Sequence, residues 1–154
     1  MKVAGGEMGG LGRRLLVKSA LLAGFGLAAA PSGAEPARTT KVVYHLVDAE
    51  RVALALGNLR NHVAGAGGPG AARFACVVLG PALRVFRRSG GDLAAAEDLR
   101  DRLSDGVAFY ACANTLAAQK WTLADLQPGF QLAEKGGVTL IADLQAQGHA
   151  YIRP

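Results

Sequence analysis

The two cysteines are the most chemically reactive side chains in this sequence of 154 residues, and their sequence surroundings differ. Cys112 follows the short apolar run Val107–Ala111 and precedes a segment that can form a helix from Thr115. A cysteine before the amino end of a helix feels the positive end of the helix dipole, which lowers the pKa of the thiol and favours the thiolate. Such a thiolate could attack a sulfur donor or hold a persulfide. The same position also suits a small buried residue in a tight turn, because free cysteine is among the most buried residue types.

Cys76 is predicted to be a core residue, since it stands in the middle of the apolar run Ala72–Leu79. A disulfide between Cys76 and Cys112 is conceivable, but nothing in the sequence supports it, because neighbouring strands place two cysteines at many different separations. The sequence contains no Cys-x-x-Cys and no Gly-x-Ser-x-Gly motif. Cys112 is therefore the candidate nucleophile.

Three other residues are candidates for supporting Cys112. Asn114 and Thr115 follow it closely, and either is available as the cap of the next helix. Together with nearby backbone N–H groups, they would stabilise a sulfur anion. His45 lies in the first apolar run and shares a face with valines two residues away on either side. That pattern is more typical of a core or interface residue than of a catalyst, and we keep His45 as a supporting candidate only.

A weaker candidate site, for an anion, is the Gly80-Pro81 turn with Arg84 close behind it. Arginines in such a position more often form the solvated side of a helix. The turn also lacks the Lys-Ser/Thr ending of a phosphate-binding loop. No histidine pairs with another at ligand spacing beside a carboxylate, so we expect no metal site and no other cofactor. His62, near a helix end, is expected to be solvated.

The elements that position these residues alternate between strand and helix patterns. Strands are predicted at 41–47, 72–79, 107–111, 130–133 and 149–152, and helices at 49–64, 82–88, from 92, at 115–120 and at 137–147. This alternation predicts an α/β fold, with a mostly parallel sheet covered by helices on both faces. Ligands of such sheets bind at the carboxyl ends of the strands, which is where Cys112 and Gly80 fall.

The first 34 residues have the features of a twin-arginine export signal. Arg13 and Arg14 precede an apolar run, Ala20–Ala30, that is too short for a membrane span. Small residues at Ser32–Ala34 predict cleavage after Ala34. We expect a periplasmic protein without membrane insertion after cleavage, with a flexible start at 35–40 and one domain at 41–154. An uncleaved anchor is the alternative.

Composition excludes several classes of protein. Hydrophobic residues make up 51% of the chain and charged residues 19%, which excludes a disordered chain and a coiled coil. The net charge of +5 belongs mostly to the leader, because residues 35–154 hold 13 basic and 11 acidic residues. We therefore expect no nucleic-acid partner.

Six segments, taken together and in order, resemble the DsrE/DsrF-like family of sulfur-reduction proteins, in an exported subgroup. They are 41–48, 58–62, 77–81, 111–115, 126–129 and 147–154. The resemblance implies a three-layer α/β/α fold with a mainly parallel five-stranded sheet of flavodoxin-like size, and a homo-oligomer that is a trimer or a hexamer. Cys112 matches the cysteine that carries persulfide sulfur between partner proteins in the relay members. Leu79 departs from the family, in which a polar residue is common at that position.

Three functions remain open at this point. The first is a periplasmic sulfur carrier, at most sulfurtransferase-like as an enzyme, that uses Cys112 with a sulfur-donor or acceptor protein as partner. The second is a non-catalytic oligomeric binding or assembly module of an exported redox or sulfur-metabolism system. The third, a nucleotide-binding domain, rests on fold analogy alone.

Overall fold

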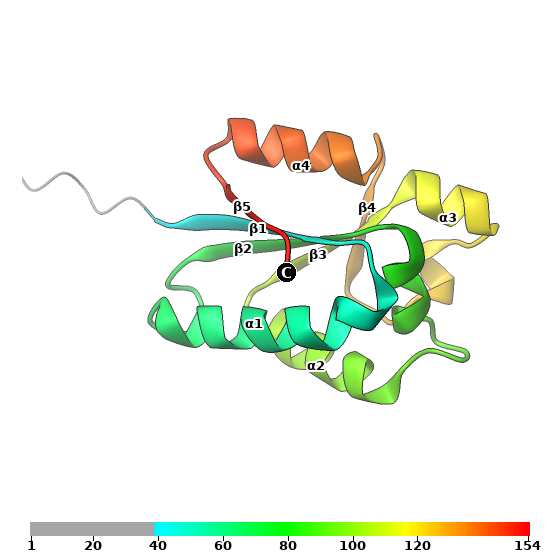
Figure 1. Cartoon of the computed structure of the whole chain (residues 1–154), viewed down its shortest axis with the longest axis horizontal. Coiled ribbons are helices and arrows are strands. Elements are labelled where there is room, and N and C mark those ends of the chain that lie inside the picture. The colour runs from blue at the N-terminus through cyan, green and yellow to red at the C-terminus, as the bar shows by residue number, and fades with distance from the viewer. Residues whose placement is uncertain (1–38) are drawn as a thin grey trace, which may run out of the picture. The chain divides into compact units, whose positions relative to one another are not determined.

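Five parallel strands form one sheet in the computed structural model, which describes residues 39–154 (Figure 1). The strands are β1 (Lys41–Leu46), β2 (Arg73–Val78), β3 (Ala108–Cys112), β4 (Phe130–Ala133) and β5 (Ala150–Ile152). They lie in the order β4-β3-β2-β1-β5, and every neighbouring pair is parallel. The predicted export signal, its cleavage point after Ala34 and residues 35–38 of the predicted flexible start lie outside the described residues.

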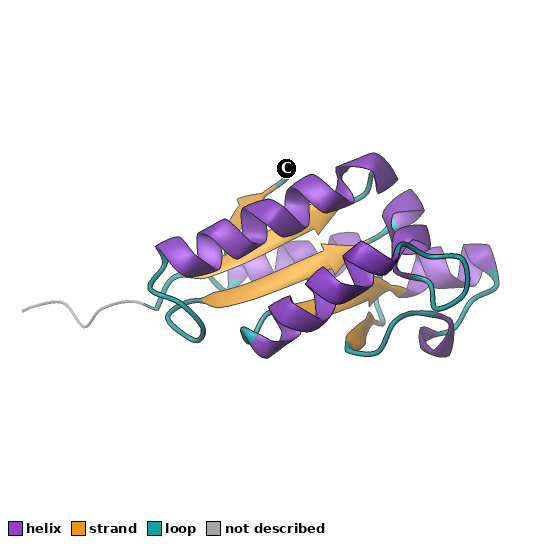
Figure 2. Ribbon diagram, turned by 90° about the horizontal axis from the view of Figure 1, so that it is seen from below, coloured by secondary structure: helices purple, strands orange, loops and turns teal. Residues whose placement is uncertain are grey.

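Helices cover both faces of the sheet (Figures 1 and 2). The α-helices are α1 (Val52–Gly65), α2 (Leu93–Ser104), α3 (Ala113–Gln119) and α4 (Gly137–Ala146), and the 3-10 turns are η1 (Ala49–Arg51), η2 (Gly80–Phe86) and η3 (Leu123–Asp125). Helices α1 and α2 lie on one face and α4 lies on the other, while α3 follows the end of β3 (Figure 1). The predicted three-layer α/β/α fold is confirmed, and the helix predicted at 82–88 is a 3-10 turn that begins at Gly80.

The core is divided by the sheet into two parts. The larger part lies between the sheet and helices α1 and α2, and it holds the fully buried rings of Phe86 and Phe109. The smaller part lies beneath α4 and consists of Val43, Ala75, Val77, Ile141 and Leu144. Because side chains alternate between the faces of a strand, this division assigns each strand residue to one side.

The alternation places Cys112 and His45 on the side of α4. Tyr110 packs against the core beneath α4, and Cys112 is two residues further along β3. Val43 belongs to that core, and His45 is two residues further along β1. Among the described residues, no helix combines the length and the apolar character needed to cross a membrane.

Candidate functional site

Cys112 is the last residue of β3 and also the residue from which α3 starts. Its backbone is extended (φ −66°, ψ 119°), and the helix begins at the next residue, Ala113. The predicted place of Cys112, between a strand and a helix, is therefore confirmed. The prediction that Asn114 or Thr115 caps this helix is wrong. Because the chain already has helical backbone angles at Ala113, both residues lie in the first turn of α3.

The thiol of Cys112 is surrounded by hydrogen-bond donors. The backbone N–H of Gly137 donates to its Sγ over 3.2 Å. The backbone N–H groups of Asn114 and Thr115 and the Thr115 hydroxyl also lower the pKa of this thiol, although the Cys112 side chain makes no capping hydrogen bond to α3. Gly137 is the first residue of α4, so the amino end of that helix points its free N–H groups and its positive dipole at the sulfur. Two segments far apart in the sequence thus converge on one thiol.

These donors determine the protonation of Cys112. Burial raises the pKa of the thiol, because only 5% of the residue is exposed. The Gly137 hydrogen bond and the donor groups of Thr115 and Asn114 favour the thiolate and together outweigh burial, so the pKa of Cys112 is lower than that of an ordinary thiol. A lowered pKa favours the thiolate, which is the nucleophilic form of cysteine.

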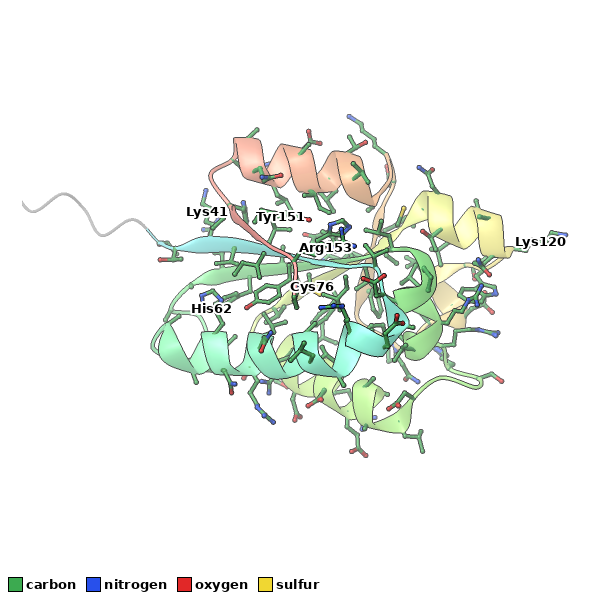
Figure 3. The ribbon with its side chains drawn as sticks, in the orientation of Figure 1. Lys41, His62, Cys76, Lys120, Tyr151 and Arg153 are labelled. Atoms are coloured by element: carbon green, nitrogen blue, oxygen red, sulfur yellow. The ribbon has the colours of Figure 1, made fainter. Side chains whose placement is uncertain are left out.

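Cys76 is the opposite case, as its place in an apolar run predicts. It lies on the side of the sheet that faces α1 and α2, where it is 1% exposed (Figure 3). Burial raises the pKa of its thiol far above the ordinary value. Both cysteines are free thiols. No disulfide joins them, because Cys76 and Cys112 occupy opposite faces of the sheet.

A glycine pair allows α4 to approach Cys112 closely. Gly136 has a positive φ of 93°, and a Cβ atom there would lie 2.7 Å from the Asn114 side-chain nitrogen. At Gly137 a Cβ atom would lie 3.0 Å from Leu79 Cδ2 and 3.3 Å from Cys112 Cβ. Sequence analysis missed both glycines. The sequence feature that could have revealed them is the Gly-Gly pair at the start of α4, which follows the edge strand β4.

The end of β2 joins the site through Thr115. The backbone N–H of Gly80 donates to Thr115 Oγ1 over 3.0 Å. Gly80 adopts a left-handed conformation with φ 57°, which a residue with a side chain rarely adopts. The structure therefore brings together Cys112, Asn114, Thr115 and Gly80. Arg84 is exposed on η2. The anion-binding role of Gly80 and Arg84 stays a prediction, with the Gly80 N–H already engaged by Thr115.

His45 is not in contact with Cys112. Strand β2 separates β1 from β3, so the two backbones are about 10 Å apart. The Nδ1 atom of His45 lies 2.7 Å from the Tyr151 hydroxyl, and Nε2 is buried without a partner among residues 39–154. Burial and the charge of Arg153 lower the pKa of His45, although Asp48 acts in the opposite direction. The supporting role of His45 stays a prediction.

The two remaining histidines also have structural neighbours. His62 is half-buried rather than solvated, since its Nδ1 lies 3.0 Å from the Tyr44 hydroxyl and its ring packs edge-on against Phe74 at 5.0 Å. The Nδ1 atom of His149 lies 2.9 Å from the Leu144 carbonyl oxygen at the end of α4. Within residues 39–154, no three side chains of histidine, cysteine, aspartate or glutamate gather as metal ligands would.

Two solved structures resemble the described domain. MTH1491, a protein of unknown function from Methanobacterium thermoautotrophicum, is 33% identical with a TM-score of 0.66, and the match covers 75% of this chain and 99% of that one. The ychN protein from E. coli is 15% identical with a TM-score of 0.59, and the match covers 75% of this chain and all of ychN. Both neighbours have DsrE-like folds. No protein-family model matches the sequence, and no curated protein does either. The identity to MTH1491 over almost all of that protein places this chain in the family of MTH1491, with the DsrE-like α/β fold.

Proposed function

We propose that this protein is an exported DsrE-family sulfur carrier that holds a persulfide on Cys112. The observation that carries the proposal is the set of N–H donors around the Cys112 sulfur, from Gly137, Asn114 and Thr115. A persulfide is an anion whose charge rests on sulfur, so the same donors that favour the thiolate would favour the loaded form. The position of the thiol at the carboxyl edge of a parallel sheet, where ligands of such sheets bind, supports the same reading.

The proposed chemistry is two successive displacements at sulfur, without net oxidation. The Cys112 thiolate attacks the outer, sulfane sulfur of a donor such as thiosulfate. A new S–S bond forms on Cys112, and sulfite leaves with the electron pair of the broken S–S bond. An acceptor thiolate then attacks the outer sulfur of the persulfide, takes it, and returns Cys112 to the thiolate. This is a sulfurtransferase-like relay, and it requires no cofactor.

The low exposure of Cys112 limits what can reach it. Only 5% of the residue is open to solvent; Gly137 lies against it, and Leu79 lies against Gly137. A small inorganic donor is therefore the most direct first substrate. Transfer to a partner protein would require the amino end of α4 to move away from the sulfur.

Intact-mass measurement tests the proposal directly. The protein is incubated with thiosulfate or polysulfide, and its intact mass is measured before and after reduction. The Cys112→Ser and Cys76→Ser variants are treated in the same way. We expect a mass gain of one or more sulfur atoms that is lost on reduction, that is absent from Cys112→Ser and that persists in Cys76→Ser. Equal loading of the protein and of Cys112→Ser would eliminate Cys112 as the carrier.

Export, location and assembly belong to the same proposal. The Arg13-Arg14 pair and the apolar run that follows support transport by the twin-arginine route to the periplasm. Fractionation of cells that express the full chain and an Arg13→Lys, Arg14→Lys double variant tests this, since the double variant should remain in the cytoplasm. The resemblance to the DsrE family supports a trimer or a hexamer, which light scattering of the purified protein would detect.

The burial of Cys112 favours one alternative function. In this alternative, Cys112, which is 5% exposed, is a packing residue without a chemical role. The protein is then a non-catalytic oligomeric binding or assembly module of an exported redox or sulfur-metabolism system. This reading predicts no sulfur loading, no alkylation of Cys112 in the folded protein, and an unchanged oligomer in Cys112→Ser. The same mass experiment therefore separates the two functions.

A further inference from the structure

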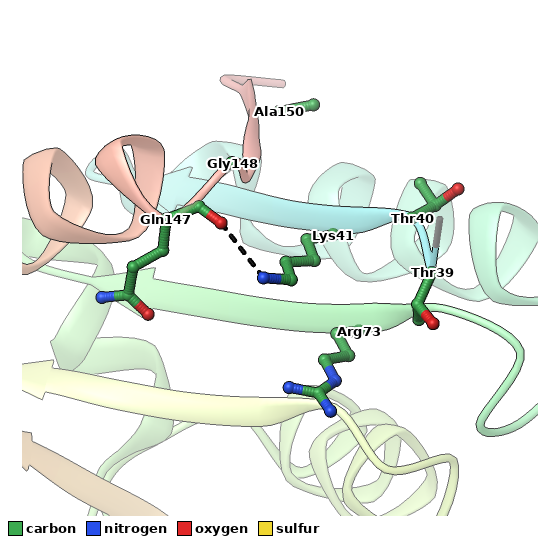
Figure 4. A pocket seen from close by; sticks show the side chains of 7 residues that line it. All are labelled: Thr39, Thr40, Lys41, Arg73, Gln147, Gly148 and Ala150. Atoms are coloured by element: carbon green, nitrogen blue, oxygen red, sulfur yellow. Dashed lines mark hydrogen bonds between the residues drawn. The ribbon is translucent and has the colours of Figure 1, made fainter. Parts of the chain in front are cut away.

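An open cleft of about 650 Å³ lies at the amino ends of β1 and β2, at the opposite end of the sheet from Cys112 (Figure 4). Thr39, Thr40, Lys41 and Arg73 line it from the strands, and Gln147 and Gly148 line it from the end of α4. None of the described residues that line the cleft is acidic. The cleft is therefore positively charged over residues 39–154.

The two cationic residues of the cleft occupy paired positions on neighbouring strands. Lys41 and Arg73 are paired in the register of the parallel strands β1 and β2, so their side chains leave the sheet on the same side. Figure 4 shows the two side chains leaving neighbouring strands, with the Lys41 ammonium group directed toward Gln147 and the Arg73 guanidinium extending toward the next strand of the sheet. Two positive charges that share one face of the sheet repel each other.

The protein accounts for one of the two charges. The Lys41 ammonium group donates to the Gln147 carbonyl oxygen over 3.1 Å, at the negative end of the α4 dipole. That contact uses one of its three donor positions. The Arg73 guanidinium takes part in none of the ion pairs and side-chain hydrogen bonds found among residues 39–154. The exposed Arg73 side chain lines the cleft and carries five N–H donors.

We infer that this cleft binds the phosphate or sulfate group of an anionic ligand, with Arg73 as the principal contact and Lys41 as the second. The planar guanidinium matches two oxygens of a tetrahedral oxyanion, and the ammonium supplies a point charge beside it. An anion between the two side chains would turn their repulsion into attraction. The hydroxyl group of Thr39, which also lines the cleft, supplies a further donor.

The size of the cleft indicates that the ligand is larger than an inorganic anion and carries an organic group as well as the phosphate or sulfate. Ligand sites of small molecules span roughly 300–1,000 Å³, and this cleft falls within that range. Arg73 also lines a neighbouring cavity of about 360 Å³ that reaches His149 and Tyr110. The remainder of an organic phosphate or sulfate ester would have room along that path. This inference is independent of the function proposed for Cys112.

Titration with inorganic phosphate and with inorganic sulfate, each at constant ionic strength maintained with chloride, tests the inference. The probe is the backbone amide NMR spectrum of the full chain. We expect saturable shifts of the Thr40, Arg73 and Gly148 amides with at least one of the two anions, and the stronger anion identifies the group that the ligand carries. Arg73→Gln should weaken this binding about tenfold, the effect of losing one charge-assisted hydrogen bond. Lys41→Gln should weaken it less.

Arg60→Gln is the matched control, because Arg60 is an exposed arginine on α1, which covers the other face of the sheet. It removes the same charge and should leave the binding unchanged. Arg73→Lys keeps the positive charge but lacks the planar guanidinium, so its affinity for the anion should lie between those of the original protein and Arg73→Gln. Shifts that rise linearly without saturation, or an equal loss of binding in Arg60→Gln and Arg73→Gln, would overturn the inference in favour of general salt effects.

Discussion

The backbone N–H of Gly137 donates to the Sγ atom of Cys112 over 3.2 Å, although 25 residues separate the two in the sequence. The contact connects the first turn of α4 with the end of β3. The pKa of the Cys112 thiol therefore depends on the position of α4, which lies in a different part of the chain. Small changes at this junction should therefore change the chemistry of Cys112 before they change the fold.

Gly137→Ala should raise the pKa of Cys112. The new Cβ atom would lie 3.0 Å from Leu79 Cδ2 and 3.3 Å from Cys112 Cβ, which is tighter than ordinary packing. We expect the amino end of α4 to shift by a few tenths of an ångström, which lengthens the hydrogen bond from the Gly137 N–H to the sulfur. The pH at which iodoacetamide alkylates Cys112 at half its maximal rate measures the pKa. The control is Gly57→Ala in α1, where a Cβ atom meets nothing within 4 Å. An unchanged midpoint in Gly137→Ala would show that the Gly137 N–H does not set the pKa.

The lowered pKa of Cys112 should also appear in the pH dependence of stability. Because the pKa is lower in the folded than in the unfolded protein, the thiolate stabilises the folded state fully above the unfolded pKa of about 8.5, and this contribution is lost as the pH falls through the folded pKa. The free energy of unfolding of the protein minus that of Cys112→Ser should therefore increase as the pH rises through this window. Urea unfolding under reducing conditions at a series of pH values measures it.

Taking the difference between the two proteins is essential here. Cys76 has a raised pKa, so its contribution to stability decreases as the pH rises above the ordinary thiol range, opposite in sign to that of Cys112. Both proteins retain Cys76, so its effect cancels. A difference that stays flat with pH would mean that the pKa of Cys112 is the same in the folded and unfolded states.

Thr115→Val should destabilise the protein by about 1–3 kcal/mol, the cost of leaving a half-buried N–H without an acceptor. The Thr115 oxygen accepts the Gly80 N–H over 3.0 Å, and valine has the same shape without that oxygen. Valine also removes a hydroxyl donor from Cys112, so the pKa of the thiol should rise. Thr115→Ser keeps the hydroxyl and should retain most of both properties. Urea unfolding and the alkylation midpoint report the two effects separately. Equal stability of Thr115→Val and the original protein would exclude the Gly80 contact as a stabilising bond.

Sequence reasoning located Cys112 because the evidence there is local. An apolar run, a cysteine and a helix-forming segment lie in one continuous stretch, and their order determines that the thiol lies at a strand end. The contact with Gly137 has no such signature. It depends on β4 lying beside β3 and on α4 returning across the face of the sheet, and this strand order cannot be inferred from alternation alone.

The two histidine predictions show the same limit. His45 and Cys112 both lie towards the carboxyl ends of strands, yet the order β4-β3-β2-β1-β5 inserts β2 between them. His62 lies near the end of an amphipathic helix, where local pattern predicts solvent. Its burial comes from Tyr44 and Phe74 on the sheet beneath it. In both cases the strand or helix that carries the histidine was predicted correctly. The surroundings of the side chain depend on residues from other elements, which the local sequence does not reveal.

Leu79→Ala should make Cys112 accessible to larger reagents without lowering its pKa. Leu79 follows the end of β2, and its Cδ2 lies 3.0 Å from the place a Gly137 Cβ would occupy, so the side chain packs against the junction that covers the sulfur. Alanine removes that packing and leaves every donor to the thiolate in place. The second-order rate of reaction with a bulky maleimide should rise, while the midpoint pH of its reaction stays the same. Leu93→Ala, at an 81% exposed leucine at the start of α2, is the control and should change neither quantity. If the bulky reagent reacts no faster with Leu79→Ala than with the original protein, access to Cys112 is controlled by the movement of α4 and not by the leucine.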